Sequence, residues 1–283
     1  MLIINRATRK LLLAGVVGAL LLMVTYVVGS PVVLAHDGDS AKADAHLRHT
    51  PYGSATLKWF PESKNLLVTV KLTGLDPNST HPAHIHAGDC DDNGPIIYML
   101  NNVVADSAGN AKVTTTISNV QDGIPSSAWS INVHNGPGLT PAAQFIPIAC
   151  GNVSNSDTSL HYTQRVHIKL GATTGQNQSV KGYAHLKLKD GTLTVVVSVE
   201  GLVPGSVHAE HIHAGSCQNQ VPGSVVYMLN NLVGNSDGDA TATTVIHGVH
   251  SIPEYGWYIN VHRTTDLSNQ TGFDPISCGN VED

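Results

Sequence analysis

The sequence predicts an all-β protein built from two tandem copies of one β-domain. Three observations lead to this prediction. Charged residues make up 13% of the 283 residues, about half the usual share of a globular domain, and the strand and turn residues Val, Thr, Ser, Asn and Gly replace them. Short segments with alternating apolar residues are separated by Gly, Pro and Asn turn signals, which is typical of a β-sandwich or barrel. Several motifs also occur twice.

The N-terminus has the pattern of a secretory signal peptide. Arg6, Arg9 and Lys10 precede an apolar run over residues 11–28, and Val33-Leu34-Ala35 offers a small-residue cleavage site. We therefore expect residues 1–35 to be a signal peptide, or an uncleaved membrane anchor because the run approaches spanning length. In both cases the remaining chain is extracytoplasmic, and contact with a membrane would run only through this segment.

Residues 36–44 are small and polar and are predicted to form a flexible lead-in. A first domain is expected over residues 45–153, a polar linker over 154–160 and a second domain over 161–283. The predicted strands of the first domain cover residues 54–60, 66–72, 96–102, 112–117 and 129–134. In the second domain, Val166, Ile168 and Leu170 alternate as a first strand, and Asp190-Gly191 predicts a hairpin between residues 183–189 and 192–200.

The two domains repeat the same motifs in the same order. Tyr-Met-Leu-Asn-Asn occurs at residues 98–102 and 227–231, Ile-Asn-Val-His at 131–134 and 259–262, and Cys-Gly-Asn-Val at 150–153 and 278–281. Four cysteines allow three disulfide connectivities. The duplication selects Cys90 with Cys150 and Cys217 with Cys278, since each copy carries an equivalent pair. Each bridge would close a loop of about 60 residues, which contributes roughly 3–4 kcal/mol in the loop-entropy model.

Histidines stand in matching patterns in both copies. The first copy has His81, His84 and His86, and the second has His208, His211 and His213. Alternate residues of a strand share one face, about 6.5–7 Å apart, so a His-x-His pair can converge on one metal ion. A third imidazole, His134 in the first copy and His262 in the second, is available on another predicted strand. Three neutral imidazoles suit copper or zinc.

These residues resemble the copper/zinc superoxide dismutase superfamily. The resemblance depends on His-x-x-His-x-His followed by a cysteine, the later Val-His strand and the closing Cys-Gly, and it covers both copies. The Ala-His-Ile-His and Val-Asn-Val-His segments are also similar to CHRD-type domains. Both relatives imply an antiparallel Greek-key β-sandwich for each domain.

The dismutase resemblance implies specific roles for the histidines and cysteines. The copper ligands would be His84, His86 and His134 in the first domain and His211, His213 and His262 in the second. His81 and His208 match the family's structural histidine, which supports the site from behind. The family's intradomain disulfide falls on the two cysteine pairs already predicted.

The sequence also departs from the dismutase pattern. Only a few residues separate Cys90 from Ile96, so the family's zinc loop, its zinc site and its bridging histidine are predicted to be absent. The guiding arginine, three positions before the last cysteine, is Pro147 in one copy and Pro275 in the other. Arg263, beside His262, is a possible substitute guide for an anion in the second domain.

Three functions remain open from the sequence. The first is a copper-dependent superoxide dismutase, whose small-molecule substrate would be superoxide. The second is a non-catalytic copper-binding or storage protein, and the third is a CHRD-like adhesive or structural module without metal. The formal net charge of -6 and the lack of a basic block argue against nucleic acid as a partner.

Overall fold

The computed structural model describes residues 32–34, 40–92 and 94–283. The predicted signal or anchor segment therefore lies outside the described residues, except for the short strand β1 (Val32–Leu34). Strands dominate the described chain, and its two helices are single turns, α1 (Ala142–Phe145) and α2 (Gln270–Phe273). The all-β fold is thus confirmed. Within the described residues no helix has the length and apolar character needed to cross a membrane.

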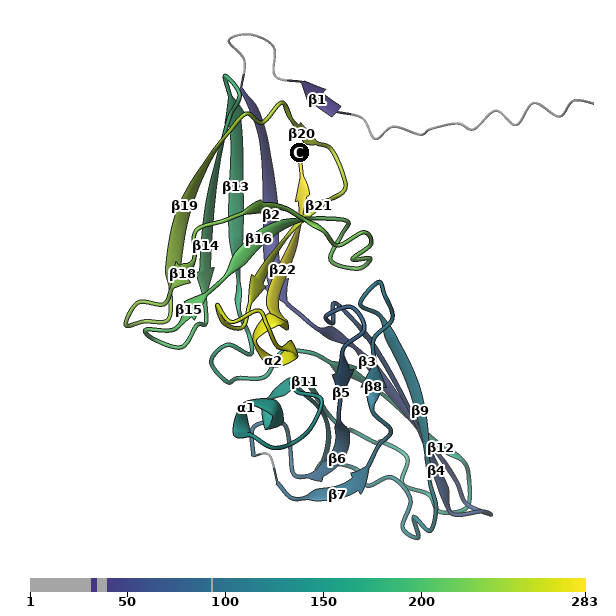
Figure 1. The fold of residues 1–283 in the computed structure, drawn as a ribbon. Helices are drawn as coiled ribbons and strands as arrows, with labels where there is room; N and C mark the ends of the chain where they lie inside the picture. The colour runs from purple at the N-terminus through teal and green to yellow at the C-terminus, as the bar shows by residue number, and fades with distance from the viewer. Residues whose placement is uncertain (1–31, 35–39, 93) are drawn as a thin grey trace, which may run out of the picture.

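The first sandwich, in the lower half of Figure 1, packs two four-stranded antiparallel sheets against each other. One sheet has the order β12-β3-β4-β9 and the other β11-β10-β6-β7. These strands are β3 (Tyr52–Phe60), β4 (Asn65–Thr73), β6 (Ala83–Ala87), β7 (Ile96–Met99), β9 (Ala111–Ile117), β10 (Trp129–His134), β11 (Pro147–Asn152) and β12 (Gln164–Leu170). A short pair, β5 (Thr80–His81) with β8 (Val103–Val104), completes this half.

The connections of the first sandwich follow a Greek key. After β4 the chain passes to β6 and β7 of the opposite sheet and then returns, so that β9 pairs with β4. In the same way β10 pairs with β6 although three other strands lie between them in the chain. This order is that of the Greek-key sandwich that the sequence predicts.

The second sandwich contains a continuous sheet of eight strands in the order β17-β16-β21-β22-β2-β13-β14-β19. These are β2 (Ala41–His49), β13 (Lys181–Lys189), β14 (Thr192–Glu200), β16 (Glu210–Ala214), β17 (Val225–Met228), β19 (Ala240–His247), β21 (Trp257–His262) and β22 (Pro275–Glu282). Two short pairs lie beside it, β15 (Val207–His208) with β18 (Leu232–Val233) and β1 with β20 (Ser251–Pro253). The predicted hairpin at Asp190-Gly191 joins β13 to β14.

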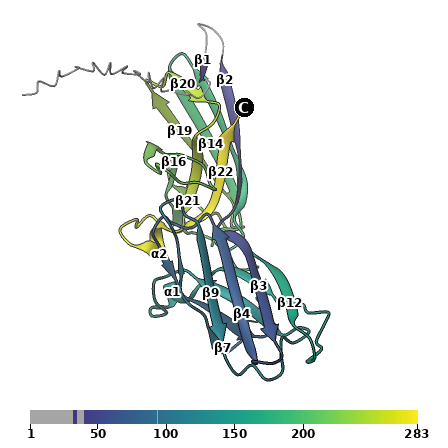
Figure 2. The same ribbon diagram turned by 90° about the vertical axis from the view of Figure 1, so that its right-hand side faces the viewer.

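The first strand of each repeat belongs to the other sandwich. Strand β2 precedes the first sandwich in the chain, yet it pairs with β13 and β22 of the second. Strand β12 begins the second repeat, yet it pairs with β3 of the first. Both views show the two strands lying in opposite halves (Figures 1 and 2). The expectation that β12 would open the second sandwich is therefore corrected. Its apolar residues do alternate, but alternation fixes the face of a strand and not its partner.

The two connections that carry the exchanged strands differ in length. Only Thr50 and Pro51 separate β2 from β3, whereas residues 171–180 separate β12 from β13. Neither connection folds its two strands into a hairpin, and each one crosses from one half of the molecule to the other. The registers are equivalent, since Leu47 of β2 lies opposite Gly182 and Leu170 of β12 lies opposite Gly53.

The predicted lead-in also needs correction. Strand β2 starts at Ala41, so residues 41–44 are part of a sheet. Its buried residues are Ala41, Ala43, Ala45 and Leu47, and they join the core of the second sandwich. Small alanines in a polar stretch give a weak hydrophobic signal, which is why the sequence pattern placed the boundary too late. The core of the first sandwich correspondingly contains Val166, Ile168 and Leu170 of β12.

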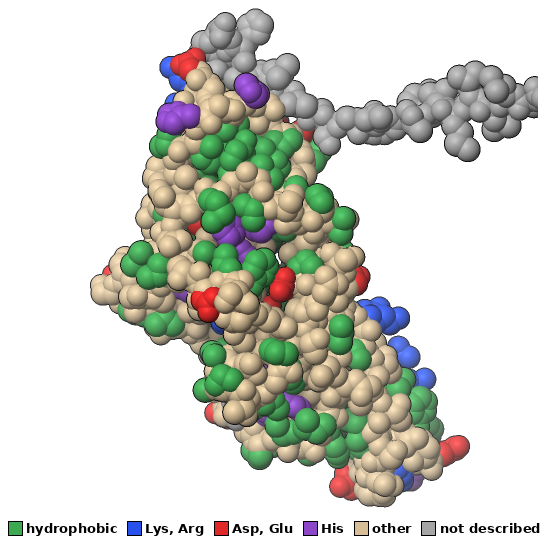
Figure 3. Space-filling view, viewed as in Figure 1, with side chains coloured by type: hydrophobic (Ala, Val, Ile, Leu, Met, Phe, Trp, Pro, Cys, Tyr) green, Lys and Arg blue, Asp and Glu red, His purple; other side chains and the backbone are tan. Residues whose placement is uncertain are grey.

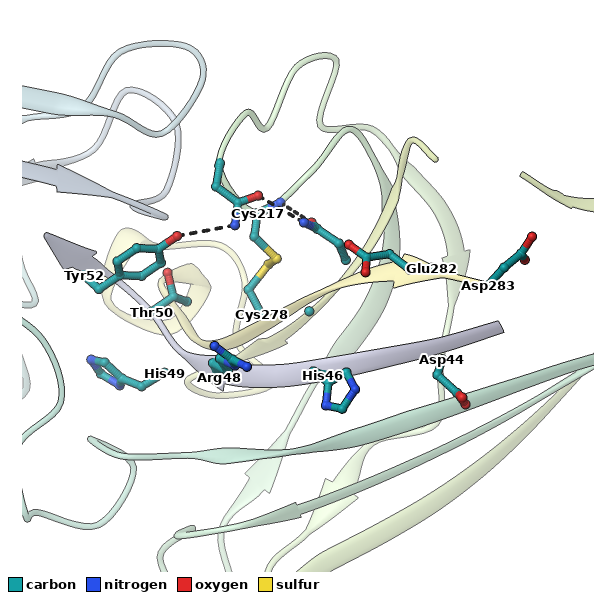
Figure 4. A pocket seen from close by; sticks show the side chains of 13 residues that line it. Asp44, His46, Arg48, His49, Thr50, Tyr52, Cys217, Cys278, Glu282 and Asp283 are labelled. Carbon is teal, nitrogen blue, oxygen red and sulfur yellow. Dashed lines mark hydrogen bonds between the residues drawn. A yellow bond between two sulfur atoms is a disulfide. The ribbon is translucent and has the colours of Figure 1, made fainter. Parts of the chain in front are cut away.

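The two sandwiches also meet through polar contacts. The side chain of Gln270 in α2 donates to the carbonyl oxygens of Thr80 and Asn135 at 2.9 and 3.0 Å. Gln220 donates to Leu75 O at 2.7 Å. Near β2, a cavity of about 580 Å³ is bordered by the Cys217–Cys278 disulfide, and a chain of hydrogen bonds links Tyr52, Gln218 and Asn280 there (Figure 4). This cavity contains none of the six histidines predicted to bind metal.

Candidate metal centres

Neighbouring strands bring the predicted ligands of the first sandwich together. His84 and His86 lie on β6 and face away from the core, because Ile85 between them is fully buried in it. Strand β10 lies beside β6, with Asn132 opposite His84 and Ser130 opposite His86, and it ends at His134. The second sandwich repeats this arrangement with His211 and His213 on β16 and with β21, which ends at His262.

In each sandwich the three imidazoles form a compact triad. One nitrogen from each ring lies within 4.8 Å of the others, both for His84, His86 and His134 and for His211, His213 and His262. The ring centroids of the first triad are 4.9–5.7 Å apart. All six side chains are buried. These two groups are the clusters of potential metal ligands found within the described residues.

Backbone carbonyls fix which nitrogen faces the centre of each triad. In the first, Nδ1 of His86 donates to Gly94 O at 2.7 Å and Nδ1 of His134 donates to Phe145 O at 2.6 Å. Nε2 of both rings has no hydrogen-bond partner although it is buried. In the second triad, Nδ1 of His213 donates to Gly223 O at 3.0 Å, and Nδ1 of His262 donates to Phe273 O. This pattern fixes the tautomer that presents a lone pair on Nε2, as metal-binding histidines require.

The remaining ring of each triad, His84 or His211, makes no hydrogen bond to a backbone carbonyl. Nδ1 of His211 lies 3.2 Å from Nε2 of His262. Two nitrogen ligands about 2.0–2.1 Å from a tetrahedral metal ion are about 3.3 Å apart, so this spacing suits a shared ion. In the first triad, both nitrogens of His84 are buried without a hydrogen-bond partner. Unpartnered buried polar atoms are costly, so the donor set fits a metal ion.

Burial holds five of the six triad rings neutral. The pKa of His84, His134 and His211 is lowered to about 4 and that of His262 to about 3, mainly by burial and in addition by the neighbouring triad rings. Burial also lowers the pKa of His213. Neutral imidazole is the form that binds metal, so these five rings are in the binding form at neutral pH.

His81 and His208 support the triads from behind, where the resemblance places them. Nδ1 of His81 donates to the carbonyl oxygen of His134 at 2.9 Å, and Nδ1 of His208 donates to that of His262 at 2.9 Å. The other nitrogen of each ring lies 2.7 Å from a serine hydroxyl, Ser79 or Ser206. Each of these histidines therefore fixes the end of the strand that carries the third triad ring.

The surroundings of the two triads differ in residues that the sequence analysis did not single out. Tyr258 stacks on His213 with ring centroids 5.2 Å apart, whereas Ser130 takes the matching place in the first sandwich. His213 and Tyr258 border a cavity of about 440 Å³ that is also lined by Asp76 of the first sandwich. Burial raises the pKa of Asp76 to about 6. In Figure 3 histidine surface shows in a recess at the level of β16, with hydrophobic side chains around it. Sequence reasoning missed Asp76 because the cavity joins loops from two repeats.

Arg263 is not positioned to guide an anion. It follows His262 by one residue and is buried, and its charge contributes to the lowered pKa of His81 in the first sandwich. Burial lowers the pKa of Arg263, and the opposite charge of Asp274 acts against that shift. The Asp274 carboxylate in turn lies 4.0 Å from Nε2 of His81 in the first sandwich. Arg263 is therefore too buried to guide an anion, because a guiding side chain must face the approaching anion.

Two disulfides have the predicted pairing. Cys90 is bonded to Cys150 and Cys217 to Cys278. Each bond ties the loop that follows the His-x-His strand to the last strand of the same repeat, and the described residues contain no free cysteine. Between Cys90 and β7 the chain has only residues 91–95, so this stretch is too short for the dismutase zinc loop.

Comparison with known proteins finds one family model and a solved structure that are similar to this chain. The CHRD domain family model matches residues 35–137, a stretch that includes the whole first triad. Among solved structures, a SOD-like protein from Bacillus subtilis matches with 16% sequence identity and a TM-score of 0.27, covering 38% of this chain and 93% of that one. A comparison with curated proteins finds no match.

Proposed function

We propose that this protein is an extracytoplasmic copper-binding protein that holds one copper ion in each histidine triad. The observation that carries this proposal is that three buried ring nitrogens converge in each sandwich, and that Nε2 of His86, His134 and His213 has no hydrogen-bond partner. Neutral imidazole is a ligand of copper and of zinc, and the dismutase resemblance favours copper. The two disulfides, which persist in oxidising compartments, and the signal-like N-terminus support the location.

Five of the six triad histidines have a defined ligand atom in this proposal. His86, His134, His213 and His262 would bind the ion through Nε2, since Nδ1 of each ring is held by a backbone carbonyl. His211 would bind through Nδ1, the atom that faces Nε2 of His262. Three protein ligands leave one coordination position open for a small molecule.

We further propose that the loaded protein dismutates superoxide, converting two superoxide anions and two protons into O₂ and hydrogen peroxide. Bound copper would supply the one-electron redox chemistry of this reaction. The protein would keep the imidazoles neutral and converged. Beside the second triad, the carboxyl group of Asp76 from the first sandwich lines the same cavity, and its pKa of about 6 suits a group that delivers protons.

A copper-binding role without catalysis is the second candidate. The positions of the family's guiding arginine hold Pro147 and Pro275, and Arg263 is buried opposite Asp274. Without a positive side chain at the site, the electrostatic acceleration of an approaching anion is lost. This observation favours slow turnover, or storage and transport of copper.

A dismutase assay on the copper-loaded protein separates the two candidates. We expect superoxide consumption above that of free copper, and its loss in a His84→Ala/His211→Ala double variant that remains folded. An exposed pair distant from the triads, His167→Ala/His185→Ala, serves as control and should keep full activity. Equal rates for wild type and triad variant would refute catalysis, and a protein that binds no metal would leave only the CHRD-like module.

A further inference from the structure

The methionines of this chain have an unusual distribution. Of the four methionines, Met1 and Met23 lie in the predicted signal segment, and the other two occupy the same place in the repeated Tyr-Met-Leu-Asn-Asn motif. Met99 ends strand β7 and Met228 ends strand β17. Both side chains are exposed, at 62% and 66%. Neither thioether is therefore committed to a hydrophobic core.

Strand register places each methionine opposite a triad histidine. Met99 lies opposite His84 in the β6–β7 pair, and Met228 lies opposite His211 in the β16–β17 pair. Residues that lie directly opposite in an antiparallel pair project from the same face of the sheet, with Cβ atoms about 4.5–5.5 Å apart. The methionine side chains thus project from the face of each sheet that carries the triad.

The backbone hydrogen bonds between the strands show which type of antiparallel pair each histidine and methionine form. Leu100 N donates to Ala83 O at 3.0 Å, and Leu229 N donates to Glu210 O at 3.1 Å. Because hydrogen-bonded and non-hydrogen-bonded pairs alternate along an antiparallel ladder, the adjacent His–Met pair is of the non-hydrogen-bonded type. In this type the side chains come closest, with Cα atoms about 4.5 Å apart.

The neighbouring residue confirms which way the strand faces. Tyr98 packs against the core of the first sandwich and contacts Trp129, with ring centroids 5.5 Å apart. Tyr227 does the same with Trp257 in the second sandwich at 5.5 Å. Since successive side chains of a strand alternate, the methionine after each tyrosine faces away from the core, as the triads do.

We propose that Met99 and Met228 provide a fourth, thioether ligand that makes each triad selective for Cu(I). This inference rests on the proposed function, because it needs metal at the triads. Three imidazoles leave one coordination position open, and soft thioether sulfur prefers Cu(I) to zinc. Methionine has three rotatable bonds, so an exposed thioether opposite a ligand histidine can turn in when the ion arrives.

The test uses the full mature chain and Cu(I) as the probe. A chelator competition under anaerobic conditions gives the Cu(I) Kd of the wild type and of a Met99→Leu/Met228→Leu variant, in which volume is nearly kept. We expect the Kd to rise at least tenfold in the variant, while the Zn(II) Kd changes less than twofold. X-ray absorption at the copper edge should show Cu–S scattering in the wild type and none in the variant.

A matched control uses valines at equivalent exposed positions. Val104 and Val233 lie in β8 and β18 and are each 56% exposed. A Val104→Leu/Val233→Leu variant should bind Cu(I) like the wild type. If the Met→Leu variant folds poorly, the absorption spectrum of the wild type alone decides, because it needs no variant.

The possible outcomes distinguish a failure of the thioether ligand from a failure of copper binding at the triads. A wild type that binds copper without Cu–S scattering, together with a Met→Leu variant whose Cu(I) Kd lies within twofold of it, overturns the thioether ligand and leaves the triads as copper sites. A wild type that takes up no copper in either oxidation state overturns both proposals.

Discussion

At the scale of single residues, the candidate sites depend on buried imidazoles whose hydrogen bonds decide which nitrogen is free. The sequence could predict the triads because alternate residues of a strand share a face. It could not predict that Gly94 and Phe145 supply the carbonyl oxygens that orient His86 and His134. Those acceptors are backbone atoms of loops and of α1, and no side-chain pattern identifies them.

Acid should destabilise the metal-free protein. Burial lowers the pKa of His49, His81, His84, His134, His211 and His262 in the folded state to about 3–4, below the unfolded value of 6.5. Between these values the unfolded chain binds more protons, so stability is lost as pH falls from about 6.5 towards 4. Glu210 and Asp76, with raised pKa values of about 8 and 6, and Asp274, whose pKa burial raises well above its usual value, act in the opposite direction, but they are outnumbered.

Urea unfolding of the metal-free protein at several pH values checks this prediction. We expect the midpoint to fall steadily from pH 6.5 to pH 4.5. A midpoint that stays constant or rises over this range would mean that the histidines are not held neutral by burial.

His81 should matter for the first triad although it does not belong to it. Removing its ring in His81→Ala leaves the buried carbonyl oxygen of His134 without this donor, which should cost about 1–3 kcal/mol of stability. Loss of such support should also weaken metal binding about 10–100-fold. Metal titration in a His211→Ala background, where only the first triad is intact, measures the effect.

The matched control is His208→Ala in the same background. It removes the equivalent contact to His262 and should change the affinity of the first triad less than twofold. If both variants lowered that affinity equally, the effect would come from general destabilisation instead of support of one strand.

At the scale of elements, the exchange of β2 and β12 is the feature that the sequence did not predict. The alternating residues Val166, Ile168 and Leu170 identify β12 as a strand, and the repeat identifies its counterpart. Neither observation says which sheet receives the strand, since equivalent strands of two similar repeats compete for equivalent edges. The small and polar residues of β2 also gave a weak strand signal.

The exchange predicts which fragment of the chain folds alone. A fragment of residues 52–171 contains β3 to β12 and all strands of the first sandwich, whereas residues 41–153 have β2 in place of β12. We expect the first fragment to unfold cooperatively as a monomer and the second to associate or stay unfolded, because its β3 edge lacks a partner. Circular dichroism and sedimentation distinguish these states. Equal stability of the two fragments as monomers would contradict the exchange.

At the scale of the whole molecule, the exchanged strands and the buried groups at the interface join the sandwiches into one unit. Leu47 and Val166 each belong to the core opposite to their own repeat. The wall of the cavity beside His213 comes from both sandwiches. The two triads therefore have different surroundings, and the first sandwich forms part of the cavity beside the second triad.

This coupling predicts a single unfolding transition. Trp59 and Trp129 report on the first sandwich and Trp257 on the second. Urea curves from tryptophan fluorescence, recorded with single-tryptophan variants, should share one midpoint with circular dichroism, since neither core is complete without a strand from the other repeat. Two separated midpoints would show that the sandwiches are independent.

The central claim is that each triad holds one metal ion. Equilibrium dialysis of the purified mature protein against copper, followed by elemental analysis, tests it most directly. The account predicts about two copper ions per chain in the wild type, about one in His84→Ala and about one in His211→Ala. A wild type without bound copper, or a stoichiometry that neither substitution changes, would contradict it.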